Sequence, residues 1–333
     1  MTEESVLGDL QRLVSYEGPE EPLAEHLAFH ESNTQAVQLL QKSLRGETEM
    51  AEIQALRATV RILGTLAGDA TGDTVPDVSS SGSPLAQALR CEGLTGAVLE
   101  LLQRWKSPKE ERPWLLLEGL RALRLLLVLP LSAKSEHRAG KRNTAAWWVE
   151  DDVGYVRHGE ARRRLGEVLV TVLDEVKESS KAEMKAAAFG ALQNLVTGSP
   201  VAFRHLAQGP VAEKVVLLTE AQLKSLPHAA VGDGCRLLTL LCSGPRSHVR
   251  RVADAQALPL AMERPSDWNP VHPQVAPAAV VLLGVLCEAV DPQPGLLELC
   301  AGPAKQFSKQ IRDELGWARA PVASAVLALL PEG

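Results

Sequence analysis

The chain has 333 residues, a formal net charge of −6 and a pI near 5.8. This is longer than a usual single globular core, so we expect either two domains or one elongated array of repeats. The acidic balance argues against a chain built as a whole to bind nucleic acid or an anionic membrane, and the low aromatic content of 4% favours helices packed on helices.

We expect no targeting or membrane-spanning segment in this sequence. The first residues, MTEESVLGDLQ, are acidic and lack the apolar core of a signal peptide. The apolar run at Leu115–Leu131 is interrupted by Glu118, Arg121 and Arg124, so it is too charged to span a bilayer. We therefore expect a cytoplasmic protein, with the nucleus as the other compartment that fits.

The first strong helical patterns lie between residues 33 and 68. One predicted helix ends at Gly46 and the next ends at Gly68. This pair is typical of an atypical first repeat, because a terminal repeat must turn one side to water. Residues 69–84, DATGDTVPDVSSSGSP, are polar and have no period, which predicts a flexible loop inserted between helices.

The helical pattern resumes at residues 85–130 and is then lost over residues 131–159. This longer insertion contains the basic run KSEHRAGKRN and then the adjacent Trp147 and Trp148. Insertions in repeat proteins lie in loops, often on the binding face. The two tryptophans are therefore either part of a partner-binding surface or a plug over the apolar flank between repeats.

Residues 161–178 form another predicted helix, with Arg162, Arg163 and Arg164 in its first turn. Positive charge at that end opposes the helix dipole. The triplet is either solvated, balanced by the acidic run at residues 150–152, or occupied by a bound anion. Arg162 and Arg163 are accordingly candidate partner contacts.

Residues 181–218 contain a repeating unit of three helices, separated by breaks at residues 198–200 and at residues 209–210. The apolar pattern of its long helix returns three times, in steps of 45 residues. The four members of that series are Leu192, Leu237, Leu282 and Leu327, with Leu195, Leu240, Val285 and Leu330 in the same register. A period in the forties with helical content is typical of helical solenoids, in which each unit buries its apolar face against the next.

The unit resembles an armadillo repeat, through "A-L-x-N-L", a Gly/Ser/Pro turn, "x-x-L-A-x-G" and then "V-x-x-L-L". The resemblance covers residues 181–262, extends to 85–130 and 275–330, and reaches 33–68. It implies an all-α, armadillo/HEAT-like right-handed α-solenoid of about five to six repeats with atypical terminal repeats, forming one domain over residues 1–333.

The resemblance implies a protein–protein interaction scaffold that binds a partner peptide or domain on its concave face, with Gln193 and Asn194 as candidate contacts. Importin-α grips basic peptides with a Trp and Asn ladder on successive repeats. Here Asn194 matches the Asn, but Gly190 stands at the Trp position. The next repeats carry, at the two ladder positions, the pairs Cys235 with Thr239 and Val280 with Gly284. The ladder is absent, which argues against nuclear import.

Two other functions are open. Armadillo-type regulators act as nucleotide-exchange factors or co-chaperones for Hsp70 or small GTPases and carry no motif of their own. Nucleic acid could bind through the basic residues 134–142 and 157–164, although the net charge disfavours it.

We expect no enzyme activity, cofactor or metal. The sequence lacks a phosphate-binding loop, a dinucleotide fingerprint, H-E-x-x-H, G-x-S-x-G and an EF-hand loop. The number of cysteines is odd, and Cys235, Cys242 and Cys287 fall in apolar helical patterns without zinc-ligand spacing. Buried, reduced thiols are the prediction.

Overall fold

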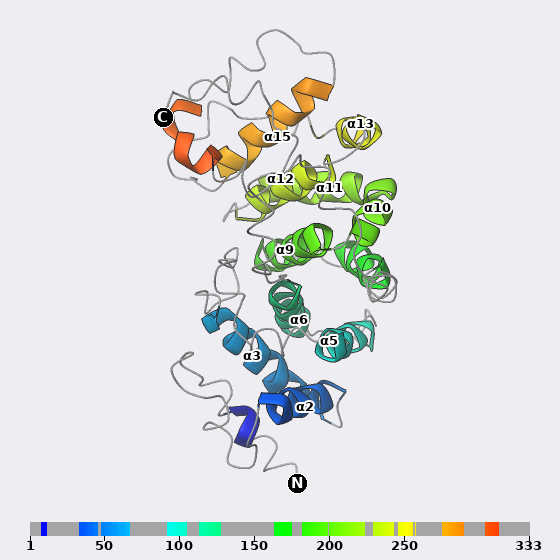
Figure 1. Cartoon of the computed structure of the whole chain (residues 1–333), viewed down its shortest axis with the longest axis vertical. Helices are drawn as coiled ribbons and strands as arrows, with labels where there is room; N and C mark the ends of the chain where they lie inside the picture. Colours follow the sequence, from blue (N-terminus) through cyan, green and yellow to red (C-terminus); the bar gives the residue numbers. More distant parts are fainter. Residues whose placement is uncertain are drawn as a thin grey trace, which may run out of the picture. The chain divides into compact units, whose positions relative to one another are not determined.

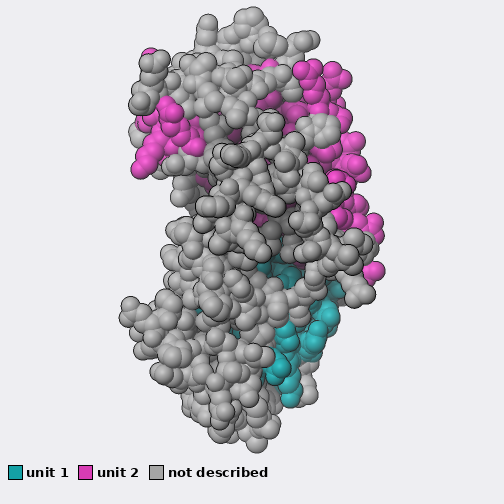
Figure 2. All heavy atoms as spheres, in the orientation of Figure 1, with its two compact units in different colours: residues 1–140 teal, residues 141–333 magenta. Residues whose placement is uncertain are grey.

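A computed structural model describes part of the chain, and every regular element in that part is a helix (Figure 1). The described residues are 8–11, 33–45, 48–66, 92–104, 113–127, 163–174, 182–198, 200–223, 229–242, 246–255, 257, 275–289 and 304–312. The predicted insertions at 69–84 and 131–159 lie outside them. The chain divides into two compact units, residues 1–140 and residues 141–333 (Figure 2). This border falls inside the insertion predicted at 131–159, and the organisation as one domain stays a prediction.

The first unit contains two stacked helix pairs. The four helices are α2 (Asn33–Leu44), α3 (Glu49–Leu66), α5 (Glu92–Arg104) and α6 (Pro113–Leu126). Helix α2 packs against α3 and α5, and α6 packs against α3 and α5, so each helix of one pair has its counterpart in the other (Figure 1). Leu40, Leu56, Leu94 and Leu120 are fully buried between them. The helix pair predicted between residues 33 and 68 is therefore confirmed.

The second unit contains the predicted three-helix repeat. The longer helices of this unit are residues 163–174, α9 (Ala182–Gly198), α10 (Pro200–Gln208), α11 (Val211–Leu223), α12 (Ala229–Leu241), α13 (Arg246–Asp254) and α15 (Val275–Ala289). The short α10 follows a Gly-Ser-Pro break and α11 follows a Gly-Pro turn, as the turn residues predict. Long α12 then packs against α11, against α9 of the preceding repeat and against α15 of the following one.

The 45-residue period is confirmed along α9, α12 and α15. Leu192, Leu237 and Leu282 are each fully buried, and the second set, Leu195, Leu240 and Val285, is no more than 5% exposed. Helix α12 packs against both α9 and α15, so each repeat supplies apolar surface that the next one lacks. The fourth members, Leu327 and Leu330, lie outside the described residues.

A glycine allows α11 and α12 to approach closely. A Cβ atom added at Gly234 of α12 would lie 2.1 Å from the hydroxyl oxygen of Thr219, a fully buried residue of α11. That hydroxyl donates a hydrogen bond of 2.7 Å to the Val215 carbonyl of its own helix. Only glycine fits at position 234 without displacing Thr219.

Three cysteines lie in the core of the second unit. Cys235, Cys242 and Cys287 are buried and free, as predicted. Burial raises the pKa of the Cys242 thiol far above its ordinary value, and it also raises the pKa of Cys287. Among the helices that the structure describes, none has both the length and the apolar character needed to cross a membrane.

Candidate functional site

The predicted site residues are distributed between the described and undescribed parts of the chain. Trp147, Trp148 and Arg162 lie outside the described residues, so their proposed contacts stay predictions. Arg163 begins the helix over 163–174, where it is half-buried and interacts within the protein. Its role as a partner contact also stays a prediction.

Gln193 holds two repeats together. Its side chain is only 1% exposed, and its Nε2 donates a hydrogen bond of 2.7 Å to the backbone carbonyl of Asp233 in α12. The Asp233 carboxylate in turn pairs with Arg236, one helical turn further on, at 3.0 Å. Because the amide of Gln193 is used inside the stack, the neighbouring Asn194 is the more accessible of the two candidates.

Asn194 lies on the outward stripe of α9. On this helix Glu183 is exposed, and Ala186 and Asn194 are half-buried. Positions 183, 186, 190 and 194 share one helical face, so Glu183 and Asn194 lie along the same stripe. Asn194 also has an interaction within the protein. Of these residues, the armadillo resemblance names Asn194 as a candidate partner contact, and that role stays a prediction.

The equivalent stripes of the next two long helices are closed. Thr239 of α12 is 1% exposed, and its hydroxyl donates to the Cys235 carbonyl at 2.9 Å. Cys235 and Val280 are buried as well, and so is Gly284 of α15. Gly190, between Ala186 and Asn194 on α9, is buried too. Among the described ladder positions of α9, α12 and α15, only Asn194 is therefore partly exposed, and the absence of a repeated side-chain ladder follows from packing as well as from composition.

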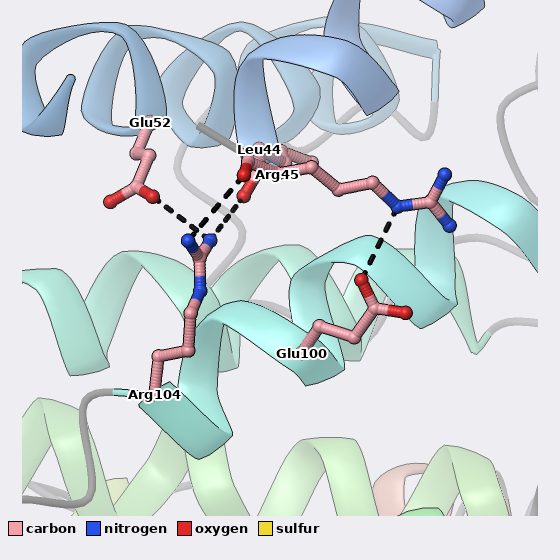
Figure 3. Close-up of polar contacts among 5 residues, drawn as sticks. All are labelled: Leu44, Arg45, Glu52, Glu100 and Arg104. Atoms are coloured by element: carbon pink, nitrogen blue, oxygen red, sulfur yellow. Dashed lines mark hydrogen bonds and ion pairs between the residues drawn. The ribbon is translucent and has the colours of Figure 1, made fainter. Parts of the chain in front are cut away.

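A polar cluster in the first unit was not predicted (Figure 3). Arg104, the last residue of α5, reaches the end of α2 with its guanidinium and donates 2.8 Å to the Leu44 carbonyl and 3.5 Å to the Arg45 carbonyl. The same guanidinium pairs with Glu52 at 2.9 Å. Nearby, the Arg45 Nε pairs with Glu100 at 3.3 Å.

This cluster closes a helix end rather than building a binding site. A cation at the C-terminus of α2 satisfies carbonyls that have no partner within the helix and opposes the negative end of its dipole. The surface hollow beside it has a volume of about 450 Å³ and is lined by Arg45, Glu100, Gln103 and Arg104. Its two arginines face two glutamates, so no net charge is left to attract an ion. A basic residue in the last turn of a helix is the signal that could have found Arg104.

No group of three His, Cys, Asp or Glu side chains able to hold a metal occurs in the described ranges. The sequence matches no known family model and no curated protein. Solved structures do resemble the chain. An engineered protein from a structural genomics consortium aligns with 89% of this chain and 98% of its own, at 17% identity and a TM-score of 0.55.

Two further structures give the same result. A second engineered protein covers 88% of this chain and 98% of its own, at 16% identity and a TM-score of 0.50. A designed armadillo repeat protein, solved in complex with the peptide (KR)4, covers 85% and 92% at 16% identity and a TM-score of 0.51. At such identities the likeness establishes the fold alone. The described part of the chain contains only helices as regular elements, and the chain matches armadillo repeat solenoids, which confirms the predicted fold class.

Proposed function

We propose that the protein is a non-enzymatic scaffold that binds another protein through the stripe of α9 containing Glu183 and Asn194. The observation that carries this proposal is the stacked-repeat core. Its buried period fixes α9 against α12 before any partner arrives. A preformed surface loses little conformational entropy on binding, so a modest contact area can give useful affinity.

The chemistry of the stripe favours a basic, extended peptide. Glu183 and Asn194 both also interact within the protein. The exposed side chain of Glu183 adds negative charge for Lys or Arg side chains, and the amide of Asn194 has further donor and acceptor capacity for a peptide backbone. The chain's net charge of −6 adds attraction at longer range. The designed armadillo protein with a (KR)4 peptide is a precedent for this type of ligand on this fold.

Two finer expectations belong to the same proposal. The insertions at 69–84 and 131–159, together with Trp147, Trp148, Arg162 and Arg163, tune the choice of partner. The protein works in the cytoplasm, and the three free, buried cysteines of the second unit support a reducing compartment.

The test is fluorescence anisotropy with a labelled (KR)4 peptide. Glu183→Gln and Asn194→Ala should each weaken binding about three- to tenfold, the effect of losing one charge-assisted or backbone hydrogen bond. Glu213→Gln is the matched control, because Glu213 is also an exposed acid in the first turn of a helix, α11, and changes the net charge equally. Equal losses in all three variants, or no binding by the wild type, would contradict the proposal.

A further inference from the structure

Helix α13 carries an unusual concentration of exposed arginine. Its sequence is RSHVRRVAD, and its buried residues are Val249 and Val252. Arg246, Arg250 and Arg251 are all exposed. The helix is therefore attached to the repeat stack through one narrow apolar stripe, and three of its five exposed residues are arginines.

Some of the charges of α13 are placed unfavourably for a helix. Arg246 and Arg250 are four residues apart, so two like charges share one helical face and repel each other. Arg246 also lies in the first turn, where positive charge opposes the helix dipole, and Asp254 places a negative charge at the opposite end. Arg251 in the last turn and the spacing of Arg250 and Asp254, four residues apart, favour the helix. The unfavourable placements relative to the dipole are therefore those of Arg246 and Asp254.

The arginine face is held in a fixed position. His248 packs against Phe203 of α10, with ring centroids 5.5 Å apart, and Arg251 donates a hydrogen bond to the Gln208 carbonyl at the end of α10. These contacts bring α10, with its exposed Arg204, beside α13 (Figure 1). The face therefore has a defined shape before any ligand binds.

The carboxylates on the neighbouring elements leave these arginines unneutralised. Glu167 pairs with His205 at 3.3 Å, and Asp174 pairs with Lys214 at 2.5 Å. Glu183 of α9, Glu213 of α11 and Asp254 of α13 itself are further exposed acids in the described part of the second unit. Within the described residues, no ion pair joins Arg204, Arg246 or Arg250 to a carboxylate.

We propose that Arg246 and Arg250, together with Arg204 and the free part of Arg251, form a docking surface for a short Asp- or Glu-rich segment of a partner protein. All the cations of this surface are arginines, whose planar guanidinium binds carboxylates bidentately and loses little hydration on pairing. The surrounding acids and the overall charge of −6 disfavour a long polyanion such as nucleic acid. This surface lies on α13 rather than on the α9 stripe and does not depend on the function proposed for that stripe.

The length of α13 determines how long a peptide is needed to test binding. Nine helical residues span about 13 Å, which about four extended peptide residues cover, so a labelled peptide of about six glutamates is long enough. Binding is measured by anisotropy for the full chain. The variant Arg246→Glu with Arg250→Glu should weaken binding about tenfold, because two ion pairs are replaced by repulsion.

The second unit supplies a matched control. Lys305 and Lys309 are also exposed and four residues apart, so Lys305→Glu with Lys309→Glu changes the net charge by the same amount. Unchanged binding by this control and by Asn194→Ala, with partial binding by Arg246→Lys with Arg250→Lys, supports a site of defined geometry on α13. Circular dichroism of each variant checks that the helices remain folded.

Three results would overturn the proposal. The first is that the wild type does not bind the glutamate peptide. The second is that both charge-reversal variants lose affinity equally, which would mean attraction by net charge alone. The third is that a single- or double-stranded oligonucleotide displaces the peptide with a steep salt dependence, which would assign the surface to nucleic acid.

Discussion

Phe203 and His248 are one repeat period apart in the sequence, and their rings meet edge to face, with centroids 5.5 Å apart and an interplanar angle of 68°. Phe203 is 5% exposed on α10, and His248 is half-buried on α13. Equivalent positions of two successive repeats are thus in direct contact. The hydrogen bond from Arg251 to the Gln208 carbonyl joins the same two short helices. The short helices α10 and α13 therefore contact each other across one repeat period, as the long helices do.

This contact predicts a measurable coupling between the two repeats. Phe203→Ala should lower the free energy of unfolding by about 3–5 kcal/mol, the usual cost of deleting a buried aromatic side chain. His248→Ala should cost less, because the ring is only half-buried. In a double-mutant cycle by urea denaturation, the coupling should be about 0.5–1.5 kcal/mol. Purely additive effects would show that the ring contact does not contribute to stability.

The close approach at Gly234 predicts a steric penalty. Gly234→Ala should destabilise the fold by about 1–3 kcal/mol, because the new methyl group collides with the Thr219 side chain 2.1 Å away. Thr219→Ala removes the colliding atoms, so the double variant should be more stable than the sum of the two single effects. Thermal denaturation followed by circular dichroism measures each variant.

A second glycine gives the control for this substitution. No atom lies within 4 Å of a Cβ added at Gly96, in the middle of α5. Gly96→Ala should therefore stabilise its helix by up to about 1 kcal/mol through propensity alone. If both alanine variants change stability in the same direction, the clash at Thr219 is not the cause of the loss at Gly234.

The fold was predictable from the sequence because the repeat period is recorded in local patterns. The spacing of Leu192, Leu237 and Leu282 marks three equivalent helices, and the Gly and Pro residues between them mark the turns. These leucines become buried as soon as the long helix of one repeat packs against the long helix of the next. Nothing about a distant part of the chain has to be known in advance.

The candidate site was less predictable, because it depends on contacts between distant residues. Gln193 and Asn194 are adjacent amides, and only the position of the Asp233 carbonyl on another helix decides which is used inside the stack. Arg104 looks like an ordinary surface residue until α5 places it at the end of α2. Closure of the α12 stripe at Thr239 likewise results from tertiary packing, which a single repeat motif does not record.

In the polar cluster of the first unit, we expect Arg104 to contribute more to stability than Arg45. Arg104→Met should lower the free energy of unfolding by about 1–3 kcal/mol, since two carbonyls of α2 and Glu52 lose a charged partner. Arg45→Met removes only an ion pair whose two side chains are 54% and 55% exposed, so its cost should be about 0–1 kcal/mol. Urea midpoints of the two variants give the comparison, and equal shifts would mean that the α2 cap is not stabilising.

The buried thiols predict slow labelling in the native protein. In a Cys91→Ser and Cys300→Ser variant, the remaining thiols are Cys235, Cys242 and Cys287, all buried. The thiolate is the reactive form, and burial both hides these groups and raises the pKa of Cys242 and Cys287. A disulfide exchange reagent at pH 8 should therefore react with them only as fast as the second unit opens, and urea should accelerate the reaction.

The same pKa shifts predict that stability falls in alkali. Above the ordinary thiol pKa of 9.0, the unfolded chain loses the Cys242 proton while the folded chain keeps it. The unfolded state then binds fewer protons, so the free energy of unfolding decreases as pH rises, by at most about 1.4 kcal/mol per pH unit for each such thiol. Below pH 9 this contribution is constant. Other groups also titrate in alkali, so the measurement compares the wild type with Cys242→Ala by urea denaturation between pH 8 and pH 10.5. The wild type should lose stability more steeply above pH 9, and parallel curves would show that the Cys242 thiol ionises as readily in the folded protein as in the unfolded chain.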